Sequence, residues 1–201
     1  MQGVRIVIVT FLVACAFAVA ARAQEFSATG VARDTTGHVV KSKIYMSGGK
    51  VRLDPQEIVS ANEQAYGILD LAQRTSTVIN PNLKTYIQQS PIQARQSLQF
   101  YATGAPPCPP VGATCKDDGP DTVNGRGAEK WEISQSMQGQ TLLTRVWVDT
   151  KLHVWTKVEV MAGTVIVMSN ELQDIHEGPQ PASLFVIPAG FREMTIPRPG
   201  G

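Results

Sequence analysis

Three segments in the last third of the chain look like long strands and are separated by very short links. They cover 141–150, 153–162 and 164–175. Parallel strands need a crossover of a dozen or more residues, so links this short favour antiparallel neighbours. The sequence therefore predicts an antiparallel meander in this region.

The first half of the chain continues the pattern, with turn residues between its segments. Asp, Gly and Ser mark turns at 34–37 and 47–50, on either side of an alternating segment at 38–47. The faces expected for that segment are Val40, Ile44 and Met46 on one side and Val39, Lys41, Lys43 and Tyr45 on the other. Further strands are expected at 26–33, 51–54, 65–72, 75–80, 85–89, 122–136 and 184–197.

Residues 91–102 break this alternation and predict a helix, because Ser90 and Pro91 suit a helix cap and its first turn. Residues 103–122 are rich in Pro, Gly and Asp and are expected to form a long loop. The expected fold class is mainly β (α+β). It consists of a curved antiparallel sheet or incomplete β-barrel with one or two helices over the concave face.

The first 23 residues have the three parts of a secretory signal peptide. Arg5 is followed by an apolar stretch and then by Ala21-Arg22-Ala23, a signal-peptidase site. Cleavage after Ala23 would leave a single domain at 24–201, exported to the periplasm.

An alternative cleavage signal lies inside that apolar stretch. Leu12-Val13-Ala14-Cys15 resembles a lipobox, which would place a lipid on Cys15 and tether the protein to a membrane. The apolar core continues through 16–20, where a lipidated protein would have a polar tether. We therefore expect the cut after Ala23.

The other two cysteines, Cys108 and Cys115, lie in the short segment CPPVGATC. An even pair in an exported chain predicts a disulfide, here a local bridge within the 103–122 loop. Zinc is the alternative, but no further His or Cys lies nearby to complete a site. We expect no metal and no cofactor.

Charge argues against a nucleic-acid partner. Removal of Arg5 and Arg22 with the leader leaves 16 basic and 17 acidic residues, a net charge of −1. Nucleic-acid binding would require a basic patch.

Several short motifs occur in an order that resembles the lipoprotein-carrier superfamily. They are KIY (43–45), KVRLD (50–54), ILDL (68–71), KTY (84–86), VWVDxxL (146–152), KVEV (157–160) and LFxIPAGF (184–191). This superfamily contains the Lol-type periplasmic carriers, the outer-membrane receptor and uncharacterised exported relatives. CPPVGATC and TVNGRGAEKW are closer to the uncharacterised relatives than to the carriers.

The resemblance covers about Phe26 to Met194 and implies an incomplete β-barrel, closed by helices around an apolar cavity for lipid acyl chains. It also implies that Arg52, at the position of an arginine on an early strand, holds a lid shut. A filled, dry core is the alternative to a cavity. The candidate lining residues are Ile44, Met46, Leu53, Ile68, Val146, Val148, Val158, Val160, Val165 and Val167. We expect Trp131, Trp147 and Trp155 to pack within the sheet and not to form a recognition platform.

None of the possible enzyme motifs has the structural context that its chemistry needs. Ser47-Gly48-Gly49-Lys50 matches S-x-x-K only formally, because its glycines predict a turn where the motif needs a helix. The three histidines, His38, His153 and His176, lack metal-ligand spacing. Asp149 and Glu159 could pair as acid and base, but solvated strand charges are the commoner case.

Two functions follow from these observations. The first is a non-enzymatic envelope protein, close to a membrane, that binds a lipid or another apolar molecule. The second is an envelope structural or interaction module with a filled core, no ligand and an unknown protein partner.

Overall fold

The computed structural model of the protein describes residues 24–56, 65–89, 107–108, 112–137 and 140–195. The predicted signal peptide at 1–23 and the predicted helix at 91–102 lie outside the described residues. In the part that is described, the one helical element is a short 3-10 turn, η3 (Ala182–Phe185). No helix among these residues is long and apolar enough to cross a membrane.

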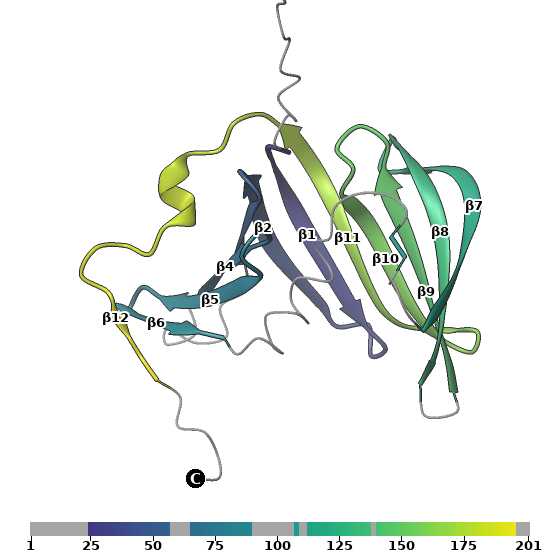
Figure 1. Ribbon diagram of the computed structural model, residues 1–201, viewed down its shortest axis with the longest axis horizontal. Coiled ribbons are helices and arrows are strands. Elements are labelled where there is room, and N and C mark those ends of the chain that lie inside the picture. The colour runs from purple at the N-terminus through teal and green to yellow at the C-terminus, as the bar shows by residue number, and fades with distance from the viewer. Residues whose placement is uncertain (1–23, 57–64, 90–106, 109–111, 138–139, 196–201) are drawn as a thin grey trace, which may run out of the picture.

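Twelve strands form a single open sheet (Figure 1). They are β1 (Phe26–Asp34), β2 (Val39–Ser47), β3 (Lys50–Pro55), β4 (Tyr66–Asp70), β5 (Thr75–Asn80), β6 (Thr85–Gln88), β7 (Ala113–Val123), β8 (Arg126–Met137), β9 (Gln140–Asp149), β10 (Trp155–Ala162), β11 (Val165–Glu177) and β12 (Arg192–Glu193). Their order across the sheet is β12-β6-β5-β4-β3-β2-β1-β11-β10-β9-β8-β7. All neighbours are antiparallel except β12 and β6, which are parallel. The predicted curved antiparallel sheet, or incomplete barrel, is confirmed.

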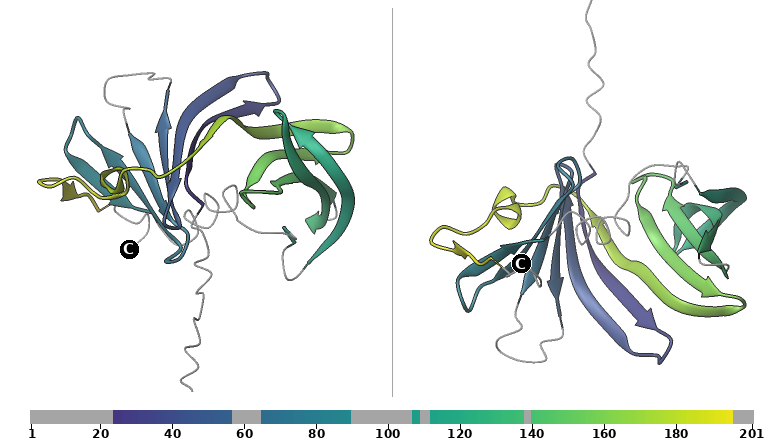
Figure 2. Two further views of the ribbon diagram at one scale, coloured as in Figure 1. Left: turned by 90° about the horizontal axis from the view of Figure 1, so that it is seen from above. Right: turned by 60° about the horizontal axis from the view of Figure 1, so that its bottom comes forward.

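The sheet is bent into two arms that face each other (Figure 2). One arm runs from β2 to β6 and the other from β10 to β7, with β1 and β11 between them. The chain leaves β11 and passes, through η3, along the far side of the first arm. η3 contacts the face that carries Arg52, since the Arg52 guanidinium donates to the carbonyl of Leu184. The opposite face of the first arm is therefore the one turned toward the second arm.

Cross-strand pairing assigns side chains to these two faces, because directly opposed residues share a face. The inner face carries Phe26, Met46 and Val51, which follow one another from β1 to β3. It continues on the second arm with Val146 and Val158. The outer face carries Arg52, Ile68, Thr77, Lys157 and Trp147. The faces predicted for 38–47 agree with this register, which pairs Ile44 with Leu53 and Met46 with Val51 on the inner side.

Two sequence-based expectations were wrong in part. The expected loop at 103–122 ends early, because 113–123 forms β7, the edge strand of the sheet. An edge strand tolerates Pro120, which has no N–H to donate, and Asp117 accepts from the N–H of Gly119 at a bulge. The expected strand at 184–197 is replaced by η3 and the two-residue β12.

Candidate ligand-binding face

The inner face presents two separate apolar walls. The first wall contains Phe26, Ala28, Ile44, Met46, Val51, Leu69, Leu152, Val154 and Leu172. The second wall contains Ile133, Val146 and Val148, with Ala113, Cys115, Trp131 and Trp155 packed against them. Within the described part of the chain the two walls do not join into one cluster. The inner face is thus lined with apolar side chains on both arms of the sheet.

Seven of the ten predicted lining residues lie on the inner face. They are Ile44, Met46, Leu53, Val146, Val148, Val158 and Val160. Ile68 lies on the outer face, because it pairs with Arg52 and Thr77. Val167 falls at the bulge where β10 and β11 lose register, and Val165 is 59% exposed beside the β10–β11 turn. That turn contains Gly163 with a positive φ of 60°.

Two tryptophans on the second wall have unpaired donors. The indole nitrogens of Trp131 and Trp155 are buried, and neither has a hydrogen-bond partner. Trp147, on the outer face, is different, because its indole donates to the Asp121 carboxylate at 2.8 Å. From the sequence, the same packing role is expected for all three tryptophans. The alternation of residues does not reveal which indole N–H groups find a hydrogen-bond acceptor.

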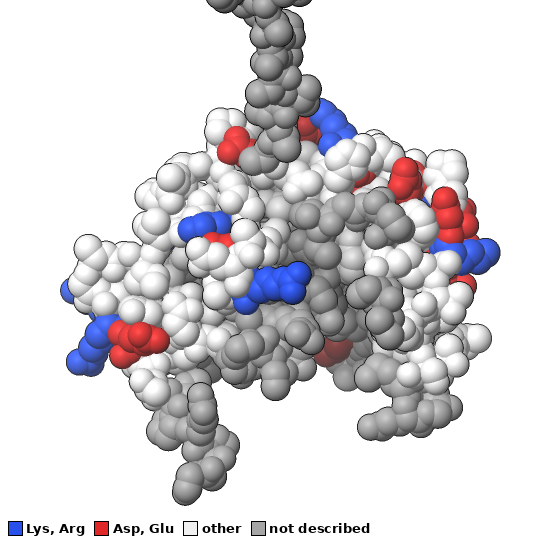
Figure 3. Space-filling model, viewed as in Figure 1, with Lys and Arg blue, Asp and Glu red and all other residues white. Residues whose placement is uncertain are grey.

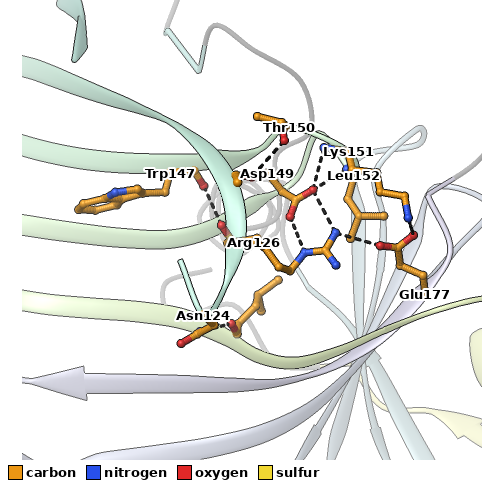
Figure 4. Close-up of polar contacts among 11 residues, drawn as sticks. Asn124, Arg126, Trp147, Asp149, Thr150, Lys151, Leu152 and Glu177 are labelled. Carbon is orange, nitrogen blue, oxygen red and sulfur yellow. Dashed lines mark hydrogen bonds and ion pairs between the residues drawn. The ribbon is translucent and has the colours of Figure 1, made fainter. Parts of the chain in front are cut away.

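A network of ion pairs lies at one end of the second arm (Figure 4). The Arg126 guanidinium binds both oxygens of Asp149, at 2.6 and 3.2 Å, and reaches Glu177 at 3.0 Å. Lys151 binds the other oxygen of Glu177 at 2.6 Å. One residue from β8 thereby connects the ends of β9 and β11.

Asp149 also organises the turn between β9 and β10. Its Oδ1 accepts from the backbone N–H groups of Lys151 and Leu152, which explains the VWVDxxL motif. Burial acts to raise the pKa of Asp149. Hydrogen bonds from Arg126 and from the two N–H groups outweigh burial and hold the pKa below its ordinary value. Glu159 pairs with Lys157 at 2.8 Å, so Asp149 and Glu159 each have another ionic partner.

Arg52 contacts Asp54, Leu184 and Tyr66 on the outer face. Its Nε donates to Asp54 at 2.7 Å, its Nη1 donates to the Leu184 carbonyl at 3.2 Å, and its guanidinium lies 3.8 Å from the Tyr66 ring centroid. Arg52 therefore anchors the η3 segment to the first arm. The lid role that the resemblance implies remains a prediction.

A pocket of about 340 Å³ lies beside this anchor, between the outer face of the first arm and the segment after η3. Its lining is Lys50, Ile68, Asp70, Gln73, Thr75, Thr77, Gln88, Phe185, Val186 and Ile187. Six of these ten residues are polar or charged, so this pocket differs in character from the inner face.

The predicted disulfide is present between Cys108 and Cys115, whose Cα atoms are 6.0 Å apart. Cys115 lies on β7 opposite Ile133, so the bridge attaches residue 108 to the second wall. Among the described residues no group of His, Cys, Asp and Glu is arranged to hold a metal ion.

Charges of opposite sign lie close together on the surface. On the side viewed in Figure 3, Lys and Arg atoms mostly lie beside Asp and Glu atoms, with uncharged surface between these groups. Lys116 and Lys130, for example, both contact Asp118, at 2.8 and 3.7 Å.

At the sequence level, no family model and no curated protein matches this chain. Solved structures do. MucB superimposes with a TM-score of 0.52 and 16% identity over 84% of this chain and 58% of MucB. MucB in complex with MucA(peri) gives 0.53 and 14% identity over 86% and 57%. This chain thus spans less than two thirds of MucB.

A LolA superfamily protein from Nitrosomonas europaea is a further structural neighbour. It has a TM-score of 0.39 and 11% identity over 81% of this chain and 90% of its own. Its name belongs to the superfamily that the sequence motifs resemble, and its sequence identity to this chain is low.

Proposed function

We propose that this protein is a non-enzymatic component of the cell envelope that holds a lipid or another apolar ligand against its inner face. The observation that supports this most directly is the pair of apolar walls on two facing arms. Apolar side chains line the inner face on both arms of the sheet. A concave apolar surface of this kind suits a ligand with an acyl chain.

Export is part of the proposal. The leader predicts release at Ala23 into the periplasm, and a disulfide persists in that oxidising compartment. Structural neighbours are named as a LolA superfamily protein and as the mycobacterial lipoprotein LppX, and both names fit an envelope setting.

The test compares one polar substitution on each face. Val160 is a half-buried inner-face residue that pairs with Thr144, and Leu143 is a half-buried outer-face residue on the next rung. We expect Val160→Asp to weaken binding of a fluorescent apolar probe about tenfold, because a carboxylate would be brought against the ligand. Leu143→Asp is the matched control and should bind like the wild type. Equal binding by both variants, or no binding by the wild type, would contradict the proposal.

A second candidate function is an interaction module, and one observation favours it. MucB, one of the structural neighbours, has been solved in complex with MucA(peri). The module would associate with another envelope protein without a ligand. Two measurements distinguish the functions. If the protein is an interaction module, cross-linking in intact cells should capture the same protein partner with the wild type and with Val160→Asp. The wild type should then bind no apolar probe.

A further inference from the structure

Two hairpin turns lie at the same end of the sheet, which we call the hairpin end (Figure 1). They are the β1–β2 turn at 35–38 and the β10–β11 turn at 163–164. Asp34, the last residue of β1, pairs with Met168, so the end of β1 meets the beginning of β11. The network of ion pairs in Figure 4 lies at the opposite end, where β9 and β11 finish. The two ends of the sheet therefore differ in chemistry.

Apolar side chains are exposed at the hairpin end. Val165 is 59% exposed, Ile166 is 44% exposed and Val40, on the neighbouring hairpin, is 39% exposed. Isolated exposed apolar residues are common on proteins, but here two are consecutive beside a turn. Ile166 lies opposite Met161, so both strands of the β10–β11 hairpin are apolar near the turn. Such a group of side chains is suited to contact with another apolar phase.

Two cations lie on the adjacent hairpin. Arg33 and Lys41 are both exposed. They share the outer face of β1 and β2 as diagonal neighbours, because Arg33 lies opposite Val39 and Lys41 lies opposite Val31. Like charges this close repel each other, so an external anion placed beside both would be attracted to the pair.

Among the described residues, no carboxylate forms an ion pair with either cation. Glu159 and Glu171 lie on the same rungs of the sheet but two strands away. Glu159 binds Lys157 at 2.8 Å, and Glu171 accepts from the Asn124 amide at 2.9 Å. The Asp34 carboxylate accepts hydrogen bonds within its own turn. The hairpin end thus combines exposed apolar side chains with two cations that are available to an outside anion.

From this combination we propose that the hairpin end docks on the surface of an anionic lipid bilayer. Val165 and Ile166 enter the boundary between headgroups and acyl chains, and Arg33 and Lys41 contact lipid phosphates. Binding of this kind grows with the apolar area buried and with attraction to anionic lipids. Val40 lies on the same side of β2 as Ile44, so docking brings one end of the first apolar wall next to the membrane. The inference goes beyond the proposed function and does not depend on it, because docking needs no bound ligand.

Co-sedimentation of the exported, purified protein with lipid vesicles tests this. One set of vesicles contains phosphatidylcholine and phosphatidylglycerol in equal parts, and the other contains phosphatidylcholine alone. We expect the wild type to bind the anionic vesicles, and to bind them less as the salt concentration rises. Val165→Ser/Ile166→Ser should bind about tenfold more weakly, because less apolar surface enters the bilayer. Arg33→Gln/Lys41→Gln should also lose about tenfold on the anionic vesicles, because two lipid phosphates lose their partners.

Each variant has a matched control. Val186→Ser/Ile187→Ser removes two apolar residues that are 53% and 37% exposed on the segment after η3, far from the hairpin end. Lys116→Gln/Lys151→Gln removes two cations whose side chains are each 72% exposed and paired with carboxylates. Both controls should bind like the wild type.

No sedimentation of the wild type with anionic vesicles would overturn the proposal. An equal loss in a variant and its control would overturn it as well, because the contact would then not lie at the hairpin end. Failure of docking together with normal uptake of a fluorescent apolar probe would refute this inference alone. Normal docking without probe uptake would refute the proposed function and leave the docking surface in place.

Discussion

At the residue scale, Asp149 connects local sequence to tertiary structure. It is 1% exposed, yet its carboxylate receives four hydrogen bonds, two from the Arg126 guanidinium and two from backbone N–H groups. A buried carboxylate is tolerated only when it is satisfied in this way. Its loss would leave Arg126 with Glu177 alone and would leave the β9–β10 turn without its acceptor.

We therefore expect Asp149→Ala to lower the free energy of unfolding by about 3 kcal/mol. Chemical denaturation measures this. Lys116→Ala is the control, because Lys116 also pairs with an aspartate but its side chain is 72% exposed, and it should have almost no effect. Equal stability of the two variants would contradict the role given to Asp149.

The same carboxylate predicts a pH dependence. The pKa of Asp149 is held below its ordinary value, as is that of Glu177 through its hydrogen bonds from Lys151 and Arg126. Such groups stabilise the fold above their unfolded pKa, near pH 4, and this contribution is lost as the pH falls through the folded pKa. We expect the free energy of unfolding to fall below about pH 4, and to fall less steeply in Asp149→Asn. An identical slope in variant and wild type would argue against this.

At the scale of elements, two attachments hold segments to the sheet: the disulfide on β7 and the Arg52 contact with η3. Each joins an irregular segment to a strand that is already paired with its neighbour. Loss of either attachment should therefore loosen the segment and leave the strands in place.

Removal of the disulfide should be a local event. Cys108 and Cys115 are only seven positions apart in the sequence, so the loop-closure contribution is at most about 2.5 kcal/mol. Cys108→Ser should speed amide exchange at the start of β7 and leave β1 and β11 protected, as measured by hydrogen exchange with mass spectrometry. Loss of protection throughout the sheet would show that the bridge is not local.

Arg52→Leu should release the segment from Ala182 to Ile187, which would exchange its amides faster. Lys50→Leu is the control, because Lys50 lies on the same face and its ion pair, at 3.9 Å, is with Asp70 on the neighbouring strand and not with η3. If Arg52 also governs a lid, as the family resemblance implies, the variant should hold the apolar probe more tightly or release it more slowly. If the affinity for the apolar probe and its release rate are unchanged, the role of Arg52 is limited to holding the η3 segment on the outer face.

At the scale of the whole molecule, the two-residue period predicted the sheet well where one face is buried. β5 matches its expected range, and β1, β2, β9, β10 and β11 agree within two residues at each end. The two-residue period did not predict β7, because its segment CKDDGPDT contains Pro120 and three aspartates. These residues are tolerated there because an edge strand has one side without a neighbouring strand. The inner position of Leu53 and the outer position of Ile68 depend on register between strands, which alternation within one strand does not determine.

The site was predictable in outline only. Its apolar character followed from the strand pattern, and seven of the predicted residues share the inner face. The two unpaired indoles were not predictable, because they flank β9 from strands that are 24 residues apart in sequence at Trp131 and Trp155. That arrangement exists only once β8, β9 and β10 are in register.

The most direct test of the central claim is the mass of the exported protein under native conditions. The full-length gene should be expressed in a bacterium with an envelope, and the product purified gently and measured by native mass spectrometry. We expect a chain that begins at Gln24, lacks two hydrogens because of the disulfide, and carries an additional apolar mass that Val160→Asp loses. A bare chain that also fails to take up added methyl dodecanoate would contradict the claim that the inner face holds a ligand.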